Sequence, residues 1–317
     1  MSVLSKIVSK TIGVVSPKYR TLSQWAVIYN NIIQTKTISA KTKDNRKNYL
    51  SKILVVFGDT AISKIRSCDI SIFIAEIQKT HPQLARRVLV ELQCLFEQAL
   101  LARWIEEDPS LVVKRPRVTV SRQRLSLSEW EDIYNYTDCC SPPWVSRLLL
   151  LALITGQRRG DLLKMRFSNI WINENTGIEY LRIKQEKTGV NLAIPLDIKL
   201  NILDKSLREV IESCRSYAIL DSDNDGYLLR KTTGGKLSPP SASWRFEQAR
   251  EAVLGIHSSK GTPASLHEIR SLAERLYREQ GINTMQLLGH TSQTMTDLYN
   301  RDRGLSSREG QWKTVVL

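Results

Sequence analysis

The sequence predicts a mainly α fold in two domains, the second of which contains a small antiparallel β-sheet. Three observations lead to this prediction. The chain has 317 residues, which is enough for two hydrophobic cores. Most of its apolar residues recur at helical spacing. Two runs rich in β-branched residues, 178–183 and 191–196, flank the turn-forming residues 186–189 and predict a β-hairpin.

The first domain, residues 21–112, is expected to be a compact helical unit with basic exposed faces. Its helices are predicted to begin near Thr21 or Ser23 and near Thr42, Ile70 and Leu84. The second helix is expected to bury Tyr49, Ile53 and Val56. The last one carries an apolar stripe at helical spacing, formed by Leu89, Leu92, Phe96 and Leu100.

Residues 113–126 are predicted to be a basic linker, because the segment is rich in Lys and Arg and has little helical pattern. Ser128-Glu129-Trp130-Glu131 offers a capping box that opens the second domain, residues 127–317. An apolar helix is expected at 144–155. Its apolar run is too short for a membrane span and indicates a buried helix. Beyond the hairpin, the chain is expected to be helical again, apart from a loop at 221–235.

The charge is unevenly distributed. The chain carries a net charge of +14, of which residues 1–126 contribute +12 and the remainder +2. Such a concentration favours a domain that grips a polyanion such as a nucleic acid backbone. The five cysteines show no metal-site spacing, which fits reduced thiols in a cytoplasmic protein. The first ten residues have no signal-peptide core, so we expect a cytoplasmic location and no membrane partner.

Four separated segments contain candidate catalytic residues. They are Thr155-Gly156-Gln157-Arg158-Arg159-Gly160-Asp161-Leu162, the hairpin turn with Lys187, His267-Glu268-Ile269-Arg270, and Leu287-Leu288-Gly289-His290, which Tyr299 follows nine residues later. Taken singly, each pattern is more often structural. An Arg or Lys in a turn is usually a surface residue, and a Tyr on an amphipathic helix is usually half-buried in a core.

Together and in this order, the segments resemble the tyrosine recombinases, in particular the lambda-type phage integrases. The signature of that family is Arg, Lys, His-x-x-Arg, His or Trp, and then Tyr. The corresponding stretches here are 154–162, 187–195, 267–272 and 287–295, and the resemblance extends over residues 21–317. It implies the catalytic residues Arg158, Lys187, His267, Arg270, His290 and Tyr299.

The resemblance implies a two-domain DNA clamp. Its parts would be a helical, SAM-like core-binding domain at 21–112 and a mostly α catalytic domain at 127–317. The activity implied is that of a site-specific DNA recombinase, an integrase that integrates or excises a phage, prophage or related mobile element. Cleavage would proceed through a 3′-phosphotyrosine formed by Tyr299, with neither ATP nor metal as cofactor. The implied partners are double-stranded DNA attachment sites and a homotetramer on that DNA, in the nucleoid of a bacterial host. A host DNA-bending protein and an excisionase are candidate accessory partners.

The chemistry explains these residue types. The transition state of phosphodiester cleavage gathers negative charge on the non-bridging oxygens, which Arg158 and Arg270 can hold by bidentate hydrogen bonds. His267 and His290 can add donors or exchange protons. Lys187 is implied as the acid that protonates the leaving 5′ oxygen.

Some alternatives remain open at this stage. Asp161 stands where the family has a carboxylate that orients the catalytic arginine, or it caps a helix. Lambda-type integrases carry a further small domain before the core-binding domain, and residues 1–20 are too few for one. Either recombination is simpler here or the gene has lost its start. The tail 311–317 is expected to be an apolar strand that packs on a neighbouring protomer. A type IB topoisomerase and a non-catalytic DNA-binding remnant of a prophage are the rival functions.

Overall fold

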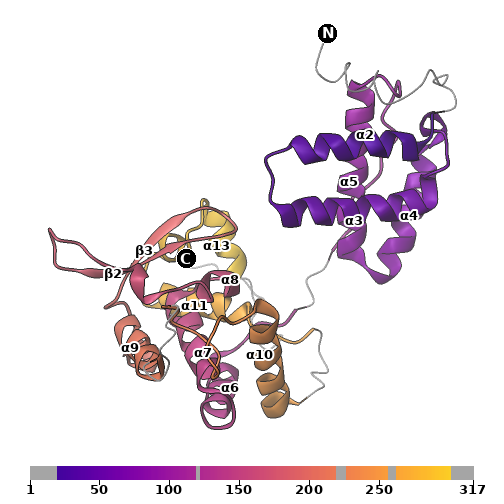
Figure 1. Cartoon of the computed structure of the whole chain (residues 1–317). Helices are drawn as coiled ribbons and strands as arrows, with labels where there is room; N and C mark the ends of the chain where they lie inside the picture. The colour runs from indigo at the N-terminus through magenta and orange to yellow at the C-terminus, as the bar shows by residue number, and fades with distance from the viewer. Residues whose placement is uncertain (1–19, 119–121, 219–225, 256–261, 301–317) are drawn as a thin grey trace, which may run out of the picture. The chain divides into compact units, whose positions relative to one another are not determined.

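The computed structural model describes residues 20–118, 122–218, 226–255 and 262–300. The chain divides into two compact units, Met1–Val120 and Ser121–Leu317 (Figure 1). Each unit has its own hydrophobic core. The predicted mainly α fold with a small antiparallel sheet is confirmed. Both the expected tail strand and the segment before Arg20 lie outside the described residues. Within the described ranges, no helix is long and apolar enough to span a membrane.

The first unit is built around one long helix. Its described helices are α2 (Leu22–Thr35), α3 (Ala40–Phe57), α4 (Ser67–Thr80) and α5 (Pro82–Leu101), with a short 3-10 turn at Ile62–Lys64. Helix α5 packs against the other three helices. Thr21 caps α2 as expected, because its hydroxyl accepts the N–H of Gln24, whose side chain in turn accepts the N–H of Thr21.

The predicted buried face of α3 is partly wrong. Val56 is 52% exposed, whereas Leu50, Ile53 and Phe57 are buried. These three side chains follow the spacing of three and four that aligns residues on one helix face. That face lies toward α2 and α5, since α3 contacts both helices. Sequence spacing alone allowed either of two neighbouring faces.

The second unit is organised around helix α7. Its described helices are α6 (Leu127–Cys140), α7 (Pro143–Thr155), α8 (Arg159–Leu162), α9 (Leu207–Ala218), α10 (Pro239–Leu254), α11 (Glu268–Glu279), α12 (Thr284–Leu288) and α13 (Gln293–Asn300). Helix α7 contacts α6, α9, α10 and α11, and its residues from Trp144 to Thr155 are buried apart from Arg147. The prediction of a buried apolar helix is therefore confirmed.

The predicted hairpin is present as strands β2 (Glu179–Lys184) and β3 (Asn191–Pro195), which pair antiparallel with Leu181 opposite Ile194. A third strand, β1 (Ile170–Ile172), pairs with β2 and was not expected from the sequence. It is too short for its alternation to stand out. A second small hairpin, β4 (Lys199–Leu200) and β5 (Lys205–Ser206), was also missed.

The entry into α6 differs from the prediction. The capping box consists of Ser126 and Glu129, two residues before the expected start, because the Ser126 hydroxyl accepts the N–H of Glu129. The residues just before this cap pack on the second unit rather than lying free of it. Gln123 donates its backbone N–H to the carbonyl of Thr262, and Arg124 is buried in an ion pair with Glu268 at 2.9 Å.

Candidate active site

The candidate catalytic residues are all in the second unit, on separate elements. They lie at the start of α8, in the turn between β2 and β3, at the start of α11, directly after α12, and within α13. In that order, they are Arg158; Lys187; His267 and Arg270; His290; and Tyr299. The contacts described below link His267, Arg270, His290 and Tyr299 to one another, and Arg158 is connected to them through Gln185 and the Leu288 carbonyl. Lys187 lies in an exposed turn beside them.

Gly156 ends α7 and makes the close packing of the site possible. It has a φ of +62°, a left-handed conformation that glycine adopts without a steric penalty. A Cβ at this position would lie 2.7 Å from the side chain of Leu288, so any other residue would force that buried side chain to shift. The Gly156 carbonyl also accepts a 2.7 Å hydrogen bond from Nη1 of Arg270.

Arg270 is the buried cation of the site, with 1% of its surface exposed. Besides Gly156, its Nη2 donates to the carbonyl of Leu288 at 2.7 Å and contacts Nε2 of His290 at 3.0 Å. Its Nε is buried without a hydrogen-bond partner. Burial lowers the pKa of Arg270 to about 10, so the guanidinium remains charged at neutral pH. The site therefore holds a positive charge whose position is determined by two backbone carbonyls.

His290 is a neutral imidazole in this arrangement. An arginine can only donate hydrogen bonds, so Nε2 of His290 must accept from Arg270. The ring proton then lies on Nδ1, which donates to the Thr296 hydroxyl at 2.9 Å. Burial, followed by the charges of Arg270 and Arg158, lowers the pKa of His290 to about 4. Both observations assign the same protonation state.

Tyr299 lies against the two histidines. Its half-buried ring stacks on His290, with centroids 5.4 Å apart and planes at 18°. The phenolic oxygen is 3.5 Å from Nε2 of His267, and the guanidinium carbon of Arg270 is 5.9 Å from the centre of the ring. The hydroxyl thus lies beside a possible proton acceptor and close to a fixed positive charge.

His267 is surrounded by cations although part of its ring reaches solvent. Close packing of protein atoms lowers its pKa to about 4, and the charges of Arg270, Arg158, Lys187 and Arg122 act in the same direction. Part of the His267 ring is exposed, so burial lowers its pKa less than it would for a core residue. We therefore infer that the repulsion from these four cations is the more important cause of the low pKa. An imidazole in this position would be stabilised in its charged form by an arriving anion.

Arg158 is hydrogen-bonded to a glutamine that lies outside the family motifs. Its Nη1 donates to Oε1 of Gln185 at 2.8 Å. Gln185 directly follows β2, where it continues the inward alternation of Leu181 and Ile183, and it is fully buried. A glutamine at the inward position of an alternating strand is a recognisable sign of a polar role, because buried polar groups require partners.

The turn with Lys187 is held by Asp161. The backbone N–H of Glu186 donates to Oδ1 of Asp161 at 2.9 Å. Asp161 lies inside α8 and does not cap it, since the N-terminal cap of that helix is Arg158. The cap interpretation is therefore wrong, and the carboxylate instead fixes the residue next to Lys187. Oδ2 of Asp161 is buried and has no hydrogen-bond partner.

A cavity of about 420 Å³ opens next to these residues. Its lining includes Arg122, Arg158, Arg159, Ser243, Ser265 and His267. Arg159 donates to the hydroxyl of Ser243, and Arg122 donates to that of Ser265 at 3.1 Å. Three guanidiniums and two hydroxyls around one opening form a surface suited to phosphate groups. Among the described residues, no cluster of His, Cys, Asp and Glu could hold a metal ion.

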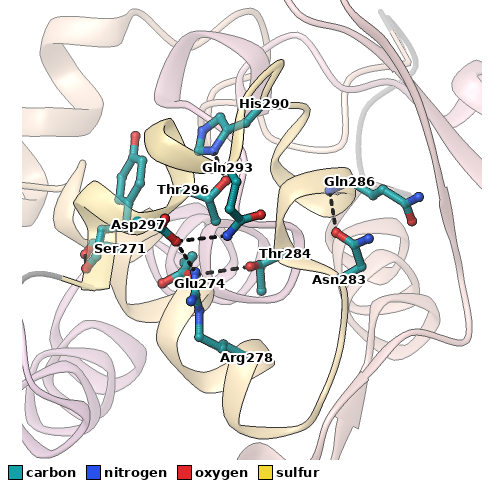
Figure 2. A network of polar contacts seen from close by, with 11 residues as sticks. Ser271, Glu274, Arg278, Asn283, Thr284, Gln286, His290, Gln293, Thr296 and Asp297 are labelled. Carbon is teal, nitrogen blue, oxygen red and sulfur yellow. Dashed lines mark hydrogen bonds and ion pairs between the residues drawn. The ribbon is translucent and has the colours of Figure 1, made fainter.

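Helix α13, which carries Tyr299, is attached to α11 by polar contacts. Nη2 of Arg278 in α11 lies 2.7 Å from Oε1 of Glu274 and 3.3 Å from Oδ1 of Asp297. Figure 2 shows these residues in the polar network between the two helices. The hydroxyl of Ser271 donates to the backbone carbonyl of Tyr299 at 3.0 Å. The nucleophile candidate is therefore held through both its backbone and its helix.

Comparison with known proteins identifies the family. The profile of the phage integrase family matches residues 123–304. The chain is 35% identical over 306 residues to the prophage integrase IntE of Escherichia coli strain K12. The match covers 93% of this chain and 77% of that protein.

Solved structures of lambda integrase are similar over both units. A crystal structure of residues 75–356 of that protein, a dimer bound to a COC′ core site, has a TM-score of 0.82 at 28% identity. The match covers 94% of this chain and 99% of that one. A lambda integrase tetramer bound to a Holliday junction gives a TM-score of 0.82 at 27% identity, over 98% of this chain and 83% of that one. Matching profile, sequence and fold together establish that the chain belongs to the phage integrase family.

Proposed function

We propose that this protein is a site-specific DNA recombinase that integrates or excises a phage or prophage by cutting DNA with Tyr299. The observation that carries the proposal is the position of the Tyr299 hydroxyl. It lies 3.5 Å from Nε2 of His267, on a ring stacked against His290 and close to the buried Arg270. Family membership supports the same reaction, since the related proteins are integrases.

Arg158 and Arg270 would bind the non-bridging oxygens of the scissile phosphate. The charge on these oxygens grows as the phosphorus becomes five-coordinate, so donors that are already in place stabilise the transition state more than the ground state. Arg270 is well suited to this role because Leu288 and Gly156 hold it through their carbonyls. Little reorganisation is then needed when the charge develops.

Proton transfers would complete the reaction. The phenol of Tyr299 loses its proton to Nε2 of His267, and the phenolate oxygen attacks phosphorus. The bond from phosphorus to the 5′ oxygen breaks, and that oxygen takes a proton from the ammonium of Lys187. A phosphate in the site would raise the pKa of His267 from about 4, because its negative charge opposes the surrounding cations. The covalent phosphotyrosine conserves the bond energy for rejoining.

Double-stranded DNA attachment sites are the proposed substrate, and a homotetramer the proposed assembly. The lambda integrase structures, one a dimer on a core site and one a tetramer on a Holliday junction, support both. The net charge of +14 supports binding to a polyanion.

The test is direct detection of the covalent adduct. Tyr299→Phe should abolish the denaturant-resistant protein–DNA adduct on a nicked suicide substrate, while DNA affinity stays within about twofold because only a hydroxyl is lost. Tyr134→Phe removes a hydroxyl from α6 and should leave the adduct intact. An adduct in the Tyr299→Phe variant would mean that another residue attacks.

Two further outcomes distinguish the rival functions. A wild-type chain that forms no adduct but binds the site would be a non-catalytic DNA-binding remnant. A chain that forms the adduct and relaxes supercoils, but never exchanges strands between two attachment sites, would be a topoisomerase.

A further inference from the structure

We infer that Gln185 is a positioning residue that aligns Arg158 with the turn carrying Lys187. The inference rests on the proposed function, and it concerns a side chain that makes no contact with the reacting atoms. Gln185 lies directly after β2, and none of its surface is exposed. A buried amide is costly unless each of its polar atoms has a partner, so its contacts indicate why it is there.

The amide of Gln185 uses its full hydrogen-bonding capacity. Its Oε1 accepts from Nη1 of Arg158 at 2.8 Å and from the hydroxyl of Thr188 at 2.7 Å. Its Nε2 donates to Oε1 of Gln157 at 2.8 Å and to the carbonyl of Leu288 at 2.9 Å. Because arginine only donates and a carbonyl only accepts, the orientation of the amide is determined.

The oxygen of this amide joins two parts of the site. Arg158 lies at the start of α8, whereas Thr188 directly follows Lys187 in the turn between β2 and β3. The other side of the turn is held by Asp161, which accepts the N–H of Glu186. Lys187 thus lies between two residues that are anchored to the segment of Arg158. A shift of Gln185 would displace the proposed proton donor relative to the phosphate-binding arginine.

The nitrogen of the amide joins a third part. The Leu288 carbonyl that accepts from Nε2 of Gln185 also accepts from Nη2 of Arg270. The next residue, Gly289, has a φ of +62°, and a Cβ there would lie 3.0 Å from Nε2 of Gln185. The backbone just before His290 therefore packs directly against the amide of Gln185. Gln185 therefore contacts Arg158 directly and shares the Leu288 carbonyl with Arg270.

A side chain of similar shape could fill this space without doing the same work. A methionine would fill most of the volume but offer no acceptor to Arg158. The role of the oxygen in the turn can be tested separately, because Thr188→Val removes only the hydroxyl that links Gln185 to the turn. If Gln185 only fills space, neither Gln185→Met nor Thr188→Val should slow the cleavage step selectively.

The experiment measures single-turnover cleavage of a nicked suicide substrate by the full chain, at saturating protein. A second substrate carries sulfur in place of the bridging 5′ oxygen, and its thiolate leaves without a proton donor. Thr188→Val should cleave ordinary DNA on the order of tenfold more slowly and approach the wild-type rate on the sulfur substrate. Gln185→Met should lose on the order of a hundredfold and be only partly rescued by sulfur, because Arg158 is released as well.

Controls separate the inference from the proposed function. Gln286→Met, on the exposed side of α12, should keep the wild-type rate on both substrates. Wild-type cleavage by Gln185→Met, or equal slowing of Thr188→Val on both substrates, would overturn the inference while leaving the proposed function intact. If Gln185→Met does not unfold cooperatively, the Thr188→Val result decides. A wild-type chain without cleavage would contradict the proposed function itself, and the inference with it.

Discussion

At the scale of single residues, the site combines a buried arginine with two neutral histidines. Burying the charge of Arg270 is unfavourable, and the two carbonyls that accept its hydrogen bonds offset part of that cost. His290 remains neutral because a proton on Nε2 would face the guanidinium. The site therefore has a net positive charge, which would favour the binding of an anion such as a phosphate.

The role of Lys187 can be tested by substitution. Lys187→Ala should slow cleavage of ordinary DNA on the order of a hundredfold or more, because an alkoxide leaves poorly without a proton. The rate should recover on the sulfur substrate described above. Arg158→Ala should stay slow on both substrates, since its loss weakens the transition state regardless of the leaving group. Failure of sulfur to rescue Lys187→Ala would make His267 the next candidate for the acid.

The histidines predict a pH dependence of stability in the DNA-free protein. The pKa of His267 and that of His290 are about 4 in the folded chain, lowered from an ordinary 6.5 by burial and by the charges of Arg270 and Arg158. Between these values the unfolded chain binds protons that the folded chain does not. Stability is therefore fully present above about pH 7 and declines as the pH falls toward 4.

Thermal unfolding at a series of pH values measures this effect. The double variant His267→Gln/His290→Gln should show a smaller drop in melting temperature between about pH 7 and pH 5 than the wild type. The control is His81→Gln, which replaces the exposed histidine at the C-terminal cap of α4. Its melting temperature should depend on pH as that of the wild type does. Equal slopes for the wild type and the double variant would show that these imidazoles already bind protons in the folded state.

At the scale of elements, α13 is a short helix whose position depends on its attachment to α11. Glu274 is fully buried, and its Oε1 accepts from Arg278 and from the hydroxyl of Thr284 at 3.2 Å. Asp297 lies at the exposed end of the same network (Figure 2). The two carboxylates on Arg278 therefore differ in burial, and the consequences of losing each contact should differ as well.

Removing Arg278 should be more damaging than removing Asp297. Arg278→Met takes a charged donor from the buried Glu274 carboxylate, which should cost about 1–3 kcal/mol of stability. Asp297→Asn weakens only an exposed ion pair and should cost less stability than the loss of Arg278. Chemical denaturation gives the two values, and adduct formation should decline in the same order. Equal effects would show that the ion pair to Asp297 is what holds α13.

At the scale of the whole molecule, the charge asymmetry between the two parts of the chain is the main feature. Residues 1–126 carry +12 and the remainder +2, although the candidate catalytic residues lie in the second unit. The first unit has its own hydrophobic core. We therefore expect affinity for DNA to reside mainly in one part of the chain and chemistry in the other.

This division predicts the salt dependence of binding. A fragment of residues 1–126 should bind duplex DNA weakly, and lose about a thousandfold in affinity between about 50 and about 200 mM salt, because several phosphate contacts release counterions. A fragment of residues 121–317, which keeps the Ser126 cap of α6 and the buried Arg124–Glu268 ion pair, should show a shallower dependence. Fluorescence anisotropy with labelled duplex measures both. A flat response from the first fragment would contradict its role as the electrostatic part of the clamp.

Local patterns in the sequence were sufficient for the main elements. Helix α7 and the β2–β3 hairpin were predicted because an apolar run and a turn between alternating strands are signals within a few residues. Membership of the phage integrase family was also predicted from short motifs, since residue type and order survive in the sequence. The six candidate catalytic residues came from the same resemblance, and their roles await the experiments above.

Tertiary packing alone decided the rest, because it depends on neighbours that are distant in sequence. Which face of α3 is buried was set by α2 and α5, so Val56 is exposed and Phe57 is not. The partners of Gln185 come from residues 28 positions before it and 103 positions after it. The neutral state of His290 arises from its burial and from a guanidinium 20 positions away in the sequence. A sequence lists the groups that can form such contacts, whereas only the folded chain determines which of them meet and which charges they then tolerate.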